Sequence, residues 1–67
     1  MPLFPEAHIT FNRYGPTGNA WYILGAASRA LAKAGATPEQ VQEYNKDAMS
    51  SDYEHLISVT EQWVTVE

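Results

Sequence analysis

A chain of only 67 residues that contains no cysteine has few ways to stabilise a fold. At this length folding buries only about 60% of the surface that the unfolded chain exposes, so the apolar core is small. Domains of this size usually add a disulfide, a structural metal or a second copy of the chain. The lack of cysteine removes disulfides and thiolate metal sites, and two histidines make a structural metal an unfavoured choice. We therefore expect residues 1–67 to form a single domain that assembles into a dimer or tetramer.

The charges are unevenly distributed along the chain. The net charge of −4 disfavours binding to duplex nucleic acid, whose phosphates attract lysine and arginine. Residues 1–36 carry three basic residues and one acidic residue, formally +2, whereas residues 37–67 carry one lysine and seven acidic residues, formally −6. This asymmetry favours a site for a small anion in the first part, or head-to-tail contact between copies.

The first residues of the chain resemble neither a signal peptide nor a membrane span. Residues 1–6 contain two prolines, no basic run and no long apolar stretch. We expect this segment to be extended, the protein to be cytoplasmic, and no membrane to be among its partners.

Hydrophobic periodicity and capping signals predict three helices. The alanine-rich run 19–34 is followed by Gly35, the residue best suited to a left-handed helix cap. Thr37 to Gln40 and Ser51 to Glu54 have the spacing of capping boxes, which predicts further helices over residues 38–49 and 52–62. The stripe of the first helix predicted to face the core consists of Ala20, Ile23, Leu24, Ala27, Leu31 and Ala34.

Two short strands complete an expected α+β fold. Residues 7–13 alternate apolar and polar side chains, which is the period of a half-buried strand. Residues 14–18 contain two glycines and a proline, which indicates a turn. Residues 63–66 have strand composition. Pairing them with residues 7–13 would bring the two ends of the chain together, and the sequence leaves the relative direction of the two strands open.

No arrangement of residues in the sequence favours catalysis. The two histidines are far apart, and no serine lies in a nucleophile elbow. Asp52 and Glu54 lie two positions apart on a predicted helix, so their carboxylates point in different directions and are interpreted as capping and solvation. We therefore expect a non-enzymatic protein without a cofactor.

Two segments suit a phosphorylated ligand. The turn from Gly15 to Asn19, next to Arg13 and Tyr14, leads into a helix N-terminus whose amides can hold phosphate, although it lacks the Lys-Ser/Thr pair of a P-loop. The outward face of the first helix carries Tyr22, Gly25, Ala26, Arg29 and Lys33, which combines an aromatic ring, small residues and two cations. The alternatives are an ordinary strand-to-helix turn, and a solvated face or a small-residue seam between two copies.

Three aromatic residues are ambiguous. Tyr53 has the spacing of a core residue, which is favoured over a ligand contact, whereas the neighbouring His55 is expected to face water. At least one of Trp21 and Trp63 is expected in the core, and either residue is suited to anchor an oligomer interface.

The segments GPTGNAWYILGAASRALAKAG and MSSDYEHLISVTEQWVTVE resemble a family of short phage-encoded proteins. Its pattern is a GPxGNA turn, a small-residue helix, a Ser-(Gly/Ser)-Asp-Tyr helix start and a terminal Trp-Val strand, with Ser51 here in place of the expected glycine. Most members carry no assigned function. Some small phage proteins of this general kind are sponges that sequester cyclic nucleotides made by bacterial antiphage defence, in oligomers with pockets between subunits.

The resemblance implies capture of a cyclic oligonucleotide and immune evasion in the host bacterial cytoplasm. It implies a phosphate or base-edge contact from Asn19, stacking on Tyr14 and Tyr22, and charge from Arg13 and Arg29. Lys33 and Tyr53 complete the candidate set. The alternatives are a protein-protein inhibitor or adaptor that uses its acidic second half, or a small virion or assembly component.

Overall fold

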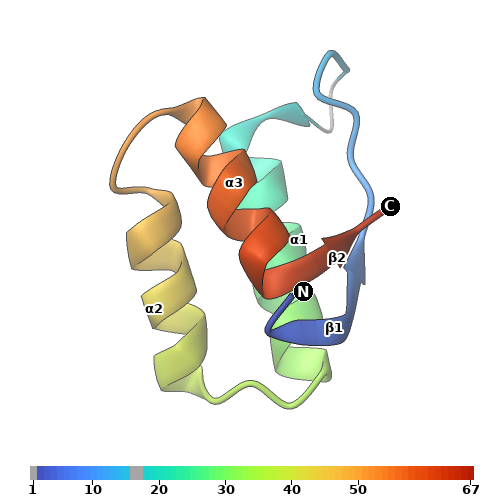
Figure 1. Cartoon of the computed structure of the whole chain (residues 1–67), viewed down its shortest axis with the longest axis vertical. Helices are drawn as coiled ribbons and strands as arrows, with labels where there is room; N and C mark the ends of the chain where they lie inside the picture. Colours follow the sequence, from blue (N-terminus) through green and yellow to red (C-terminus); the bar gives the residue numbers. More distant parts are fainter. Residues whose placement is uncertain (1, 16–17) are drawn as a thin grey trace.

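A computed structural model describes residues 2–15 and 18–67, and within these ranges the chain forms three helices and a two-stranded sheet. The elements are β1 (Phe4–Ile9), α1 (Ala20–Lys33), α2 (Pro38–Ala48), α3 (Tyr53–Trp63) and β2 (Val64–Val66). The sheet contacts α1 and α3, and α2 packs against the same two helices on the side away from the sheet (Figure 1). The α+β fold class expected from the sequence is confirmed.

The two strands are parallel, so β2 returns beside β1 after the chain has passed through all three helices (Figure 1). Phe4 pairs with Val64 and Ile9 with Val66, and the register is irregular between Phe4 and His8. This irregularity accommodates Pro5, which has no amide hydrogen to donate to the sheet.

The predicted bounds of the first strand, residues 7–13, are wrong at both ends. The strand begins at Phe4, because the Leu3 amide donates to the Gln62 carbonyl oxygen at 2.9 Å and draws this segment alongside the end of α3. It ends at Ile9, because β2 ends opposite this residue and leaves residues 10–13 without a paired strand in the described part of the chain.

The helices begin and end close to the predicted residues. Asn19 caps α1, and Gly35 after it has a φ of 100°, a value that favours glycine. Thr37 and Gln40 form the expected capping box of α2. The third helix begins one residue later than predicted, because the carboxylate of Asp52, rather than the hydroxyl of Ser51, accepts the His55 amide hydrogen at 2.9 Å.

The core is built from one stripe of each helix and the inner faces of the two strands. Of the predicted stripe of α1, four residues are buried and Ala20 and Ala34 are partly buried. Trp63 is the core tryptophan: it stacks on Phe4 and meets the Tyr44 ring edge-on. Trp21 is 76% exposed, which resolves the ambiguity between the two tryptophans.

No helix in residues 2–15 and 18–67 is both long and apolar enough to cross a lipid bilayer.

Candidate functional site

The seven candidate ligand-binding residues occupy separate parts of the fold. One group lies where the loop before α1 meets the start of α3, and another lies along the exposed face of α1. In chain order, the first group is Arg13, Asn19 and Tyr53, and the second is Tyr22, Arg29 and Lys33. Tyr14 is almost fully exposed in the loop before α1, and its amide donates to Asn12 Oδ1 at 3.0 Å.

The first group holds the loop before α1 against α3. The Tyr53 hydroxyl donates a hydrogen bond to the Gly18 carbonyl oxygen. The Arg13 guanidinium lies over the Tyr53 ring, 5.8 Å from its centroid, and forms an ion pair with Glu54. The charge of Arg13 therefore already has a partner, and a phosphate would have to compete with Glu54 for it.

Asn19 also has an intramolecular role at this place. Its side-chain oxygen accepts the Tyr22 amide hydrogen at 2.8 Å and so caps α1. The turn predicted as a phosphate site includes Pro16 and Thr17, which lie outside the described residues.

The exposed face of α1 carries two cations that, unlike Arg13, are not paired with an acidic residue among those described. Arg29 and Lys33 are exposed, lie one helical turn apart, and form no ion pair with any residue that the structure describes. Tyr22, on the same face, is 39% exposed. Among the described residues, a Cβ atom placed on Gly25 would meet nothing outside the helix backbone within 4 Å except Arg29 Nη1, at 3.6 Å. This surface, which we call the α1 face, therefore combines an aromatic ring, a stretch of open backbone and two cations.

Lys33 also borders a cavity between α1 and β1. The cavity has a volume of about 300 Å³, at the lower limit of typical small-molecule sites. Its lining residues are Glu6, Ala7, His8, Ala30, Lys33 and Ala34. Glu6 and His8 were not predicted as site residues, because the packing of β1 on α1 is a long-range contact without a local sequence signal. His8 Nδ1 lies 2.7 Å from Glu67 Oε1, so this imidazole has a carboxylate partner.

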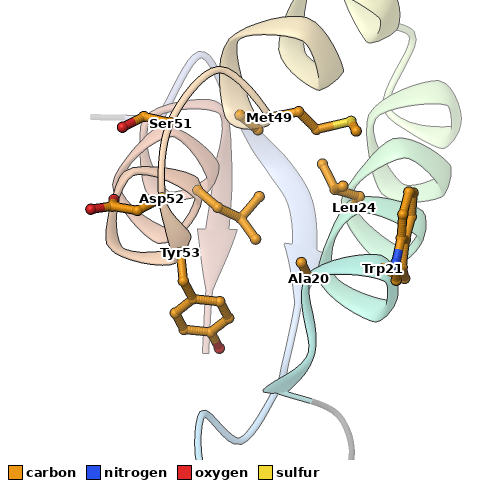
Figure 2. Close-up of a pocket in the computed structure, with 9 residues that line it drawn as sticks. Ala20, Trp21, Leu24, Met49, Ser51, Asp52 and Tyr53 are labelled. Carbon is orange, nitrogen blue, oxygen red and sulfur yellow. The ribbon is translucent and has the colours of Figure 1, made fainter.

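A second hollow, which we call the Trp21 groove, lies between the start of α1 and the connection from α2 to α3 (Figure 2). Its volume is about 270 Å³, and it is lined by Ala20, Trp21, Leu24, Ala48, Met49, Ser51, Asp52, Tyr53 and Leu56. Trp21 stands on the α1 side, and the Met49 side chain reaches toward α1 from the end of α2 (Figure 2). Trp21 was predicted as a possible interface anchor, but the groove was not predicted, because its sequence signal is a tryptophan that lies outside the apolar stripe of α1.

The acidic residues of the second half of the chain are dispersed and partly engaged. Asp52 caps α3, Glu54 pairs with Arg13, and Glu67 lies beside His8. The Asp47 carbonyl oxygen and Oδ1 lie 3.0 Å and 3.4 Å from His55 Nε2, which is also 3.2 Å from Ser50 Oγ. His55 is therefore partly buried against the end of α2, contrary to the expectation that it faces water. The described residues contain no group of three or more histidine, aspartate or glutamate side chains suited to a metal ion.

No protein-family model, curated protein or solved structure matches this chain. Function is therefore inferred from its own surfaces.

Proposed function

We propose that this chain is a non-catalytic binding protein that holds a small phosphorylated nucleotide against the α1 face. The observation that carries this proposal is the pair of exposed cations, Arg29 and Lys33, without an ion-pair partner among the described residues. Guanidinium and ammonium groups bind phosphate through charge-assisted hydrogen bonds. Tyr22 on the same face supplies a ring on which a base can stack.

The α1 face is a better ligand surface than the first group of candidate residues. A ligand at Arg13 would have to displace Glu54, and a ligand at the Tyr53 hydroxyl would have to displace the Gly18 carbonyl. A ligand at Arg29 and Lys33 displaces no ion-pair partner among the described residues, and Gly25 adds no side chain of its own to this face. This difference favours Tyr22, Arg29 and Lys33 as the principal ligand contacts.

The length of this surface favours a ligand with more than one nucleotide unit. Tyr22 and Lys33 are eleven residues apart, which corresponds to about 16 Å along a helix. A ligand that reaches both the ring and the second cation must span much of this length. Cyclic dinucleotides and trinucleotides contain more than one nucleotide unit. Their capture without turnover fits the resemblance to small phage proteins that act as sponges. In this proposal the protein acts in the cytoplasm of the infected bacterium and removes an immune signal.

The alternative of an inhibitor that mimics nucleic acid has less support. Four of the acidic residues in the second half of the chain already face a cap or a basic partner. Mimicry of a phosphate backbone requires a dense row of unpaired acidic side chains.

Calorimetric titration with cyclic dinucleotides, cyclic trinucleotides and linear dinucleotides tests the proposal. We expect Arg29→Ala to weaken binding at least about tenfold and Tyr22→Ala at least about fivefold, since a charged hydrogen bond contributes roughly 1.5–3 kcal/mol and a stacked ring roughly 1–3 kcal/mol. Lys46→Ala is the control, because it removes one positive charge from an exposed position on α2. Its affinity should match that of the wild type.

Each of the other results has a definite meaning. An absence of binding heat and of any thermal shift with all three ligand classes would overturn the proposal. Equal losses in Arg29→Ala and Lys46→Ala would show attraction to the net charge rather than a site. Binding that survives Arg29→Ala but not Arg13→Ala would move the site to the loop before α1.

A further inference from the structure

We propose that the Trp21 groove is a self-association surface, in which Trp21 of each copy inserts into the groove of a second copy. This inference is independent of the nucleotide proposal, because it concerns different side chains. Trp21 lies in the first turn of α1 and is 76% exposed, although tryptophan is among the side chains that contribute most to interfaces. Met49 at the same groove is 55% exposed. Tryptophan and methionine are both enriched at the centres of protein interfaces.

The groove has the size and chemistry of a receptor for one apolar side chain. Its volume of about 270 Å³ lies below the range of roughly 300–1,000 Å³ that is typical of small-molecule sites. Its apolar lining includes Leu24, Ala48 and Leu56, which also belong to the core, so this part of the lining is fixed by packing. A large rigid side chain that enters such a groove loses little conformational freedom.

The position of Trp21 beside the groove favours a second copy as the occupant. When a projecting side chain and a groove lie on the same face, a two-fold symmetric dimer buries both, because the same contact forms twice. A single unrelated side chain that filled the groove would cover only the part of Trp21 that lines it. The reciprocal dimer covers both features.

So small a chain has enough accessible surface for a specific interface. A specific interface buries at least about 1,000 Å² in total, or about 500 Å² from each copy. The accessible surface of this chain is 4305 Å², so the interface would cover roughly an eighth of it. A buried tryptophan alone contributes on the order of 150–250 Å².

Sedimentation velocity from about 1 to 200 µM, the range of a micromolar dissociation constant, tests the inference. We expect the wild type to dimerise, and Trp21→Ala to weaken dimerisation at least about thirtyfold, the loss of an interface hot spot. Met49→Glu, which places a charge at the groove, should weaken it similarly. Leu3→Ala is the matched control, because Leu3 is 65% exposed and does not line the Trp21 groove. Circular dichroism should show native folding for all three variants.

Mixing two variants tests the reciprocal geometry. A heterodimer of Trp21→Ala with Met49→Glu retains one contact, in which the tryptophan of the second variant enters the groove of the first, whose lining is unchanged except at Trp21. The mixture should therefore associate more strongly than either variant alone. A mixture as weak as its components would overturn the reciprocal arrangement. A wild type that remains monomeric at about 200 µM, or a Trp21→Ala variant that dimerises normally, would overturn the inference as a whole.

Discussion

Replacement of Tyr44 by phenylalanine and of Thr60 by valine, singly and together, would measure a buried hydrogen bond between α2 and α3. The two hydroxyl oxygens lie 2.7 Å apart, and both residues are 0% exposed. Neither hydroxyl can turn to solvent when its partner is removed. The pair is therefore suited to a double-mutant cycle, in which each change deletes a polar group and keeps the shape of the side chain.

The expected magnitudes follow from what each variant leaves unpaired. Thr60→Val leaves the Tyr44 hydroxyl buried without a partner, which should lower the free energy of unfolding by about 1–3 kcal/mol. Tyr44→Phe should cost less, because the Thr60 hydroxyl can turn to a carbonyl oxygen of the preceding helical turn. In the double variant no unpaired hydroxyl remains, so its loss should be smaller than the sum of the single losses by at least about 1 kcal/mol.

Urea unfolding followed by circular dichroism, together with thermal melts, gives the required free energies. A loss of 1 kcal/mol corresponds to a decrease in Tm of roughly 4–8 °C for a domain of this size. Additive losses in the double variant would refute the reasoning, since they would mean that the two hydroxyls do not depend on each other in the folded state.

Two further outcomes follow from the same structure. Gly18→Ala should prevent stable folding, because a Cβ atom there would lie 2.2 Å from the Asn12 carbonyl oxygen. Gly25→Ala should instead raise the Tm through a gain in helix propensity of about 0.5–1 kcal/mol. Thermal melts measure both effects, and equal effects at the two glycines would contradict the packing described. Burial raises the pKa of Tyr44 above its ordinary value of 10.0, although its hydrogen bond to Thr60 opposes this shift. The contribution of the neutral phenol to stability is therefore complete below pH 10.0 and decreases as the pH rises above this value. Tyr44→Phe should lose stability less steeply than the wild type in alkaline urea titrations; identical slopes would show that Tyr44 does not ionise differently on unfolding.

The elements that depend on local sequence were predictable. Thr37 and Gln40 form their capping box within a single turn, and Gly35 ends its helix through its own backbone freedom. The bounds of β1 were not predictable, because they depend on hydrogen bonds to β2 and to the end of α3, far away in the sequence. The alternation of residues 7–13 extends past Ile9, but the partner strand does not.

The candidate site was predictable only in part for a related reason. The spacing along α1 was sufficient to place Tyr22, Arg29 and Lys33 on one exposed face. No pattern in the sequence indicated that Glu54 pairs with Arg13, or that the Tyr53 hydroxyl reaches the Gly18 carbonyl. These contacts join the loop before α1 to α3, so they become visible only when the fold is known.

The parallel pairing of the strands affects how the chain can fold. The Thr65 hydroxyl donates to the Pro5 carbonyl oxygen across 60 positions of sequence, so sheet formation closes a loop that contains all three helices. Closing a long loop costs conformational entropy before its contacts are gained, whereas each helix forms from neighbouring residues. We therefore expect the helices to form early and the sheet to form late. Trp63 marks this late step: its contact with Tyr44 needs only the helices, and its stacking on Phe4 needs the closed sheet.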